Sequence, residues 1–237
     1  MKLLISPKSV EEAQECVKGQ AEIIDVKNPV EGSLGANFPW IIRDIRKIVP
    51  TSIPISATLG DVNFKPGSVA LAALGAAHAG ASFVKVGLFD FKNKQQAIEV
   101  MRAVKQTMLE YELNVQVVAA GYAEGEEIGS LNPLSIPEIG KTAKCDLVMI
   151  DTYNKTSGKT IFDYLSISSL KNFISDARKN SMKVALGGSI KISHLTVLKE
   201  LQPDIIGIRG AVCEFGDRID GAIKAELIQN FIKEMGK

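Results

Sequence analysis

The chain has 237 residues, of which 46% are hydrophobic and 23% are charged. This composition is that of a globular protein, and a chain of this length buries about 70% of its unfolded surface in one domain. The formal net charge of +1 argues against binding to nucleic acid or to an anionic membrane through bulk charge. Since no apolar run reaches the ~18 residues of a membrane span, and the first residues lack the apolar core of a signal peptide, no membrane association is expected.

The cysteines and histidines do not form a recognisable metal or redox motif. Cys16, Cys145 and Cys213 share no Cys-x-x-Cys or metal-like spacing. Cys145 lies in an apolar run, where we expect a small buried side chain. These features predict a reducing, cytoplasmic location. His78 and His194 fall in helical segments, so a histidine metal site or a catalytic triad has little support, and no metal is expected.

Apolar runs typical of strands alternate with amphipathic segments typical of helices along the whole chain. Several of the strand-like runs are continuously apolar, as in a parallel sheet covered by helices. Eight such runs without a break in composition predict one (β/α)₈ barrel domain over residues 1–237, and an open doubly wound sheet is the alternative. In chain order we expect strand 2–6, helix 9–19, strand 21–27, helix 38–49, strand 54–58, helix 68–80, strand 82–87, helix 93–111, strands 115–121 and 146–151, helix 169–180, strand 183–188, helix 192–201, strand 205–210 and helix 225–236.

Charged residues stand at the ends of three of these strands. Asp25 and Lys27 close the second strand, Lys85 lies on the fourth, and Asp151 and Lys155 follow the sixth. The carboxyl ends of the strands form the active site in (β/α)₈ barrels, so these side chains are expected to converge. A single lysine here is often only an ion-pair partner, but five charged residues from three strands favour catalysis. Because a dry, cationic environment makes a lysine amine nucleophilic, the pattern predicts carbonyl chemistry through a Schiff base.

Glycine-rich turns follow the last two expected strands, in LGGSI at 186–190 and GIRGAVC at 207–213. Such turns frequently bind phosphate in (β/α)₈ barrels, because glycine lets backbone N–H groups approach an anion. The alternative is that the glycines merely permit tight turns. GSLGAN at 32–37 lacks the spacing of a dinucleotide fingerprint, so no cofactor is expected. The predicted phosphate-binding residues are Gly187, Gly188, Ser189, Arg209, Gly210 and Ala211.

Four segments carry a family resemblance that extends over essentially the whole chain. They are DVKNPVEGSLGANFPWIIRDIR (25–46), SFVKVGLF (82–89), MIDTYNKTSGKTIFDYL (149–165) and LGGSI (186–190). They resemble the (5-formylfuran-3-yl)methyl phosphate synthases, also called 4-(hydroxymethyl)-2-furancarboxaldehyde-phosphate synthases, of methanofuran biosynthesis in methane-forming archaea. The resemblance implies a (β/α)₈-barrel lyase that condenses two molecules of glyceraldehyde 3-phosphate into a phosphorylated furan aldehyde, with loss of phosphate and water.

The resemblance also implies roles for the charged residues. Lys27 corresponds to the Schiff-base lysine and Lys85 to the residue that abstracts a proton. Asp25, Asp151 and Lys155 match further active-site positions. Independently of the resemblance, the apolar strand and the neighbouring charges of Lys27 and Lys155 predict a neutral Lys85 amine. The expected partner is the small-molecule substrate. The sequence does not determine the oligomeric state, and a homo-oligomer is one possibility. Two alternatives remain at this point: a generic class I aldolase or sugar-phosphate isomerase, and a non-catalytic phosphosugar-binding protein.

Overall fold

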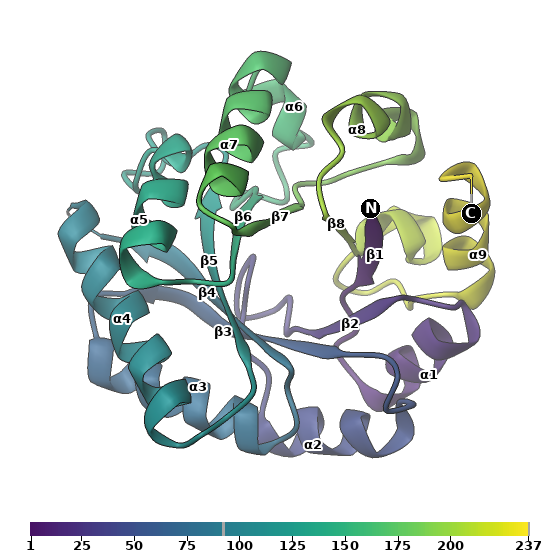
Figure 1. The fold of residues 1–237 in the computed structure, drawn as a ribbon. Helices are drawn as coiled ribbons and strands as arrows, with labels where there is room; N and C mark the ends of the chain where they lie inside the picture. Colours follow the sequence, from purple (N-terminus) through teal and green to yellow (C-terminus); the bar gives the residue numbers. More distant parts are fainter. Residues whose placement is uncertain (92, 237) are drawn as a thin grey trace.

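The computed structural model describes residues 1–91 and 93–236. In this part of the chain, strands alternate with helices, and the helices form a ring around the strands (Figure 1). All strand predictions are recovered, although the third and fourth strands run several residues further than expected. The strands are β1 (Lys2–Ile5), β2 (Ile23–Val26), β3 (Ile55–Asn63), β4 (Phe83–Asp90), β5 (Gln116–Tyr122), β6 (Leu147–Asp151), β7 (Lys183–Leu186) and β8 (Ile205–Ile208).

The strands form a closed parallel barrel in sequence order, from β1 through β8. The closing pair aligns Lys2 with Ile205 and Ile5 with Ile208. The predicted (β/α)₈ fold is therefore confirmed, and the open doubly wound sheet is excluded because β1 and β8 are hydrogen-bonded neighbours rather than edges. All strands point the same way, so their carboxyl ends meet on one face of the barrel.

The helices follow the predicted pattern, with two additions. One added helix precedes β6; its sequence, IPEIGKTA, contains proline and glycine and is too short to show a clear helical period. The other is a single turn before the seventh helix, capped by reciprocal hydrogen bonds between Thr160 and Asp163. The helices are α1 (Val10–Lys18), α2 (Pro39–Ile48), α3 (Pro66–His78), α4 (Lys94–Glu110), α5 (Ile136–Ala143), α6 (Ile161–Tyr164), α7 (Ile167–Lys179), α8 (Leu195–Leu201) and α9 (Ala225–Glu234).

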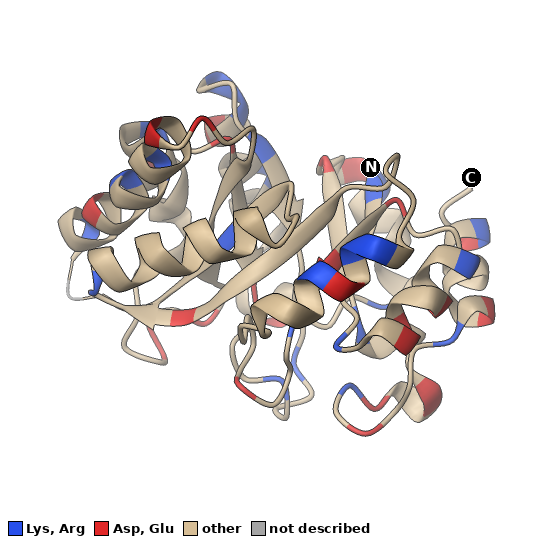
Figure 2. Cartoon of the chain, turned by 90° about the horizontal axis from the view of Figure 1, so that it is seen from below, with Lys and Arg blue, Asp and Glu red and all other residues tan. Residues whose placement is uncertain are grey.

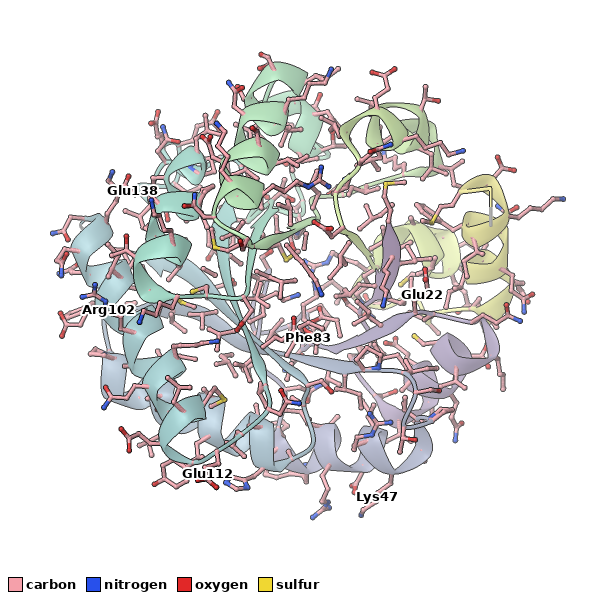
Figure 3. All side chains as sticks on the ribbon, in the orientation of Figure 1. Glu22, Lys47, Phe83, Arg102, Glu112 and Glu138 are labelled. Atoms are coloured by element: carbon pink, nitrogen blue, oxygen red, sulfur yellow. The ribbon has the colours of Figure 1, made fainter. Side chains whose placement is uncertain are left out.

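Side chains alternate between the layer under the helices and the barrel interior. On β4, Val84 and Val86 are buried in the large cluster under the helices, whereas Phe83 packs against the residues that fill the barrel. In Figure 3, Phe83 lies inside the ring of helices. Lys85 is two residues after Phe83 and therefore on the same face of β4. Phe83 packs into the barrel interior near the start of the strand, and Lys85 points into the interior one step nearer its carboxyl end. The apolar interior below the charged residues includes Leu4, Ile23, Val118, Leu147, Met149, Ala185 and Ile205.

The outer surface carries charges of both signs, interspersed over the helices (Figure 2). Helix α3, which has no Asp, Glu, Lys or Arg, is the exception. Within the described residues, no helix has the length and apolar character needed to cross a bilayer. Cys16, Cys145 and Cys213 are all buried free thiols, and no group of three or more His, Cys, Asp or Glu side chains in residues 1–91 and 93–236 is arranged to hold a metal ion.

Candidate active site

A cavity of about 430 Å³ opens at the carboxyl ends of the strands. This volume is in the range of sites for small molecules, ~300–1,000 Å³. Nine of the eleven site residues predicted from the sequence line the cavity, and Asp25 and Gly187 lie behind its wall. The nine are Lys27, Lys85, Asp151, Lys155, Gly188, Ser189, Arg209, Gly210 and Ala211.

Lys85 and Asp25 form a buried ion pair beneath the cavity. Lys85 Nζ lies 2.8 Å from Asp25 Oδ2, and both side chains are almost completely shielded from solvent. Ser6 Oγ donates a second hydrogen bond to the same carboxylate oxygen, at 3.0 Å. Burial works to raise the pKa of Asp25, but the charges of Lys85 and Lys27 outweigh it and lower that pKa. Asp25 is therefore a carboxylate, and Lys85 is its direct ion-pair partner.

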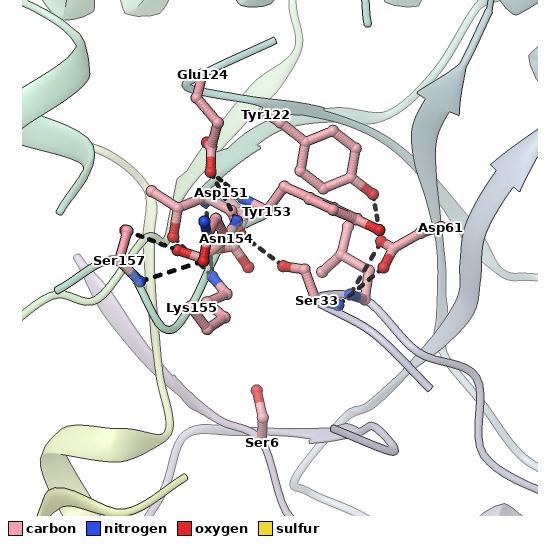
Figure 4. Close-up of polar contacts among 12 residues, drawn as sticks. Ser6, Ser33, Asp61, Tyr122, Glu124, Asp151, Tyr153, Asn154, Lys155 and Ser157 are labelled. Carbon is pink, nitrogen blue, oxygen red and sulfur yellow. Dashed lines mark hydrogen bonds and ion pairs between the residues drawn. The ribbon is translucent and has the colours of Figure 1, made fainter. Parts of the chain in front are cut away.

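A second buried ion pair joins Lys155 to Asp151 (Figure 4). Lys155 Nζ also donates to Thr152 Oγ1 at 3.0 Å, and the backbone N–H of Thr152 donates to Asp151 Oδ1 at 2.8 Å. Burial works to raise the pKa of Asp151, yet the charges of Lys155 and Lys27 lower it to about 2. Asp151 is therefore a carboxylate at neutral pH.

Lys27 is the lysine of the cluster whose ammonium has no ion-pair partner among the described residues. Its side chain lines the cavity, and the residue is only 5% exposed. Burial lowers the pKa of Lys27 to about 7, with the charges of Lys155, Arg218 and Lys85 acting in the same direction and Asp151 opposing them. A large fraction of Lys27 is thus a free amine at neutral pH, which is the form that attacks a carbonyl.

Glu124 holds the segment that carries Lys155, and sequence reasoning missed it. Glu124 follows β5, and its Oε1 accepts hydrogen bonds from the backbone N–H groups of Tyr153 at 2.8 Å and Asn154 at 2.7 Å (Figure 4). Asn154 Oδ1 in turn accepts from the N–H of Ser157 at 3.1 Å. The signal that identified Asp25, a carboxylate at the end of an apolar strand, is present here as well.

Asp61, near the end of β3, was also missed, and it anchors the long loop that follows Lys27. Its carboxylate accepts hydrogen bonds from the N–H groups of Ser33 at 2.8 Å and Leu34 at 3.0 Å, and from the hydroxyl of Tyr122 (Figure 4). Ser33 Oγ donates to Thr152 O at 2.6 Å. Burial raises the pKa of Asp61. The loop after β2 is therefore bound to β3 and to the segment after β6, and Asp61 connects it to Tyr122 at the end of β5.

The turn after β7 places its two glycines differently. The N–H of Gly187 donates to Ile150 O at 2.8 Å, so this group extends the sheet ladder and is not free to bind phosphate. Gly187 is needed for space, because a Cβ there would lie 3.1 Å from the carboxyl carbon of Asp151. Gly188 has φ +102° and Ser189 has φ +52°, and their N–H groups donate to no described residue. Of the N–H groups predicted to bind an anion at this turn, only those of Gly188 and Ser189 are therefore available.

The guanidinium of Arg209, which was predicted to bind phosphate, is hydrogen-bonded to other groups of the protein. Its Nη1 and Nη2 make paired hydrogen bonds to the carboxylate of Glu12, at 2.7 and 3.0 Å. Nη1 also donates to Ser6 O at 2.7 Å, and Nε donates to Arg218 O at 2.7 Å. The paired N–H donors of this guanidinium, which would suit phosphate, bind the carboxylate of Glu12 on α1 instead. Because Glu12 is 197 residues away in sequence, no local pattern predicts this contact.

The closed barrel and the buried lysines at its carboxyl ends define a protein of the (β/α)₈-barrel enzyme class. Residues 3–232 match the sequence model of the 4-HFC-P synthase family. The chain is 50% identical over 237 residues to the (5-formylfuran-3-yl)methyl phosphate synthase of Methanocaldococcus jannaschii, with 100% of both chains covered. The synthase of the same name from Methanobrevibacter smithii is 52% identical over 223 residues, with 94% of each chain covered. The chain therefore belongs to the 4-HFC-P synthase family, which confirms the resemblance found in its motifs.

Solved structures confirm the fold. The phosphoribosyl anthranilate isomerase from Thermus thermophilus superposes with a TM-score of 0.66, covering 100% of this chain and 98% of that one. Its sequence identity is 15%, so the likeness establishes the barrel architecture and carries no information on the reaction.

Proposed function

We propose that this protein condenses two molecules of glyceraldehyde 3-phosphate into (5-formylfuran-3-yl)methyl phosphate, with release of one phosphate and, by atom balance, two waters. Membership of the family supports the product, and the synthases of that name in other archaea support a place in methanofuran biosynthesis. The observation that carries the mechanism is the buried Lys27 amine, whose pKa burial lowers to about 7.

In the first step, the Lys27 amine attacks the aldehyde carbon of one triose phosphate. A proton moves from the attacking nitrogen to the aldehyde oxygen and gives a carbinolamine. Lys85, an ammonium paired with Asp25 at 2.8 Å, then donates a proton to the hydroxyl, which leaves as water. The products are an iminium on Lys27 and a neutral amine on Lys85. Lys85 thereby becomes a base only after the iminium has formed, which reconciles its ion pair with the predicted role in proton abstraction.

In the second step, neutral Lys85 removes the C2 proton beside the iminium, and the C–H electron pair forms an enamine. The enamine carbon attacks the aldehyde of the second triose phosphate and forms the new C–C bond. A hydroxyl of the second triose closes the ring on the iminium carbon, and loss of two waters and of the Lys27 amine makes the ring aromatic and regenerates the enzyme. One water replaces the departing phosphate at the terminal carbon, which becomes the formyl group, so that two waters are released in net. No oxidant or reductant is consumed, and aromaticity makes the sequence effectively irreversible.

The remaining cavity residues fit supporting roles in this scheme. Asp151, held as a carboxylate with a pKa of about 2, stabilises the iminium that forms on Lys27. Lys155, paired with Asp151, is suited to the phosphate that departs. The N–H groups at Gly188 and Ser189 are suited to a phosphate that is retained.

The test is incubation of the purified protein with glyceraldehyde 3-phosphate as sole substrate, followed by an ultraviolet scan and mass analysis. We expect a near-ultraviolet absorbing phosphorylated furan aldehyde and free phosphate. Borohydride added during turnover should leave a reduced triose-phosphate adduct on the peptide that contains Lys27. A non-absorbing aldol or ketose product would instead favour the aldolase or isomerase alternative. An adduct on Lys85 that persists in Lys27→Ala would overturn the Schiff-base assignment.

A further inference from the structure

One arginine on the cavity wall, Arg218, has a donor group without a partner. It lies between the short helix Glu214–Gly216 and α9 and lines the cavity. Its Nη2 is buried and makes no hydrogen bond to any described residue. A buried cationic donor that is left unpaired is unfavourable, and native proteins rarely keep one without a functional reason. Because the residue that carries this unpaired donor also lines the cavity, it indicates a site for an anion.

The backbone at Arg218 is held in place by hydrogen bonds within the protein. Arg209 Nε donates to Arg218 O at 2.7 Å, and Arg209 is itself fixed by its paired hydrogen bonds to Glu12. An antiparallel bridge between Cys213 and Ile223 closes the segment at its base. Arg209, which the sequence suggested as a ligand of phosphate, therefore supports the segment that presents a second arginine.

Arg218 stands next to the turn that follows β8. A Cβ built on Gly210 would lie 3.9 Å from Cβ of Arg218, and Gly210, Ala211 and Ser189 line the same cavity. The guanidinium also acts on the reacting amine: burial is the main cause of the low pKa of Lys27, and the charges of Lys155 and Arg218 add to it. Arg218 is thus adjacent to the turn after β8 and close enough to Lys27 for its charge to act on that amine.

Apart from Lys27, the other buried cations of this cavity wall are each paired with a carboxylate, so none of those carboxylates is left for Arg218. Asp151 is the anion that acts most strongly on the guanidinium, but it forms a direct ion pair with a lysine. The neutralised pairs are Lys85 with Asp25, Lys155 with Asp151 and Arg209 with Glu12.

We propose that Arg218 binds a phosphate group of the substrate, beside the turns at Ser189 and Gly210. This inference rests on the proposed function, because it takes the anion to be the phosphate of a triose phosphate. A guanidinium presents two parallel N–H donors to phosphate oxygens, whereas a lysine offers only a point charge. Arg218 therefore fills the role that the sequence suggested for Arg209.

Phosphate binding is measured first without turnover, by isothermal titration calorimetry with inorganic phosphate. The proteins compared are the wild type, Arg218→Gln, Arg218→Lys and the surface control Arg43→Gln. We expect Arg218→Gln to weaken phosphate binding roughly ten- to a hundredfold, Arg218→Lys to weaken it less, and Arg43→Gln to match the wild type. In steady-state assays, Arg218→Gln should raise KM for glyceraldehyde 3-phosphate by a similar factor, with a smaller change in kcat.

Equal phosphate affinity in the wild type and Arg218→Gln, or no measurable affinity in the wild type, overturns the proposal. If Arg218→Gln does not fold, as judged by its melting curve, Arg218→Lys decides: affinity equal to the wild type counts against the proposal and reduced affinity supports it. The experiments test the proposed reaction independently of this inference. A wild type that binds phosphate through Arg218 but makes no furan refutes the reaction alone, and one that makes furan with phosphate affinity independent of Arg218 refutes this inference alone.

Discussion

The burial of Lys27 determines the pH dependence expected for the proposed Schiff-base formation. Its pKa falls from 10.5 to about 7, which corresponds to about 5 kcal/mol of bias against the ammonium at ~1.36 kcal/mol per unit. At pH 7, about half of Lys27 is therefore the free amine, compared with about one in three thousand for an unperturbed lysine. Since the amine is the nucleophile, the rate of adduct formation should rise with pH and level off above about 7.

Lys155→Met tests whether the neighbouring charges help to set the pKa of Lys27. It removes a positive charge that lowers the pKa of Lys27 and leaves Asp151, which raises that pKa, without its own ion-pair partner. Both effects act in the same direction. We expect the midpoint of the pH profile to move upward by at least about one unit, or about 1.4 kcal/mol, so that adduct formation at pH 7 becomes at least about fivefold slower.

The assay is trapping with cyanoborohydride in the presence of glyceraldehyde 3-phosphate, with mass analysis of the peptide that contains Lys27 at pH values from 5.5 to about 9. Lys47→Met is the matched control, because Lys47 is an exposed lysine that pairs with Asp44 one turn away. Its midpoint should equal that of the wild type. A wild-type midpoint near 10, or a midpoint in Lys155→Met that is unchanged or lower, would refute the reasoning.

Three further substitutions test other parts of the site. Lys85→Arg retains a cation beside Asp25 but cannot act as a base, so turnover should fall by roughly 10²–10⁴-fold and exchange of the substrate C2 hydrogen with deuterium should be lost. Gly188→Val should raise KM and lower the melting temperature, because φ is +102° and the new Cβ would lie 3.0 Å from neighbouring side-chain carbons. Tyr122→Phe removes a donor to the buried carboxylate of Asp61 and should lower the free energy of unfolding in urea by ~1–3 kcal/mol.

Each substitution has a matched control elsewhere in the chain. Lys105→Arg changes a lysine that pairs with an aspartate away from the cavity, and should leave turnover intact. Gly129→Val shares a positive φ but meets no neighbouring atom within 4 Å, so it should leave KM unchanged. Tyr111→Phe changes an exposed tyrosine and should leave stability unchanged. Wild-type C2 exchange in Lys85→Arg, an unchanged KM in Gly188→Val, or unaltered unfolding in Tyr122→Phe would each contradict the corresponding argument.

The amino-acid sequence was sufficient to predict the barrel and the gathering of its charged residues at one end. Continuous apolar runs separated by amphipathic segments are local signals, and they identify parallel strands covered by helices. The period of two along a strand puts Asp25 and Lys27 on one face, and the shared direction of the strands brings Lys85 and Asp151 to the same end of the barrel. These properties depend on neighbours along the chain, so they can be read without tertiary coordinates.

Only the tertiary structure decided which charges pair and which remain free. Asp25 lies two residues from Lys27 yet pairs with Lys85, on the strand beyond β3. Arg209 is neutralised by Glu12 from α1, and Arg218 is left to face the cavity. The strength of an ion pair depends on side-chain distance and on the exclusion of water, and both are set by strand register and loop packing between segments far apart in sequence. The sequence therefore determined where the charges gather, and the packing of the barrel determined that Lys27 is the lysine without an ion-pair partner in the described cluster.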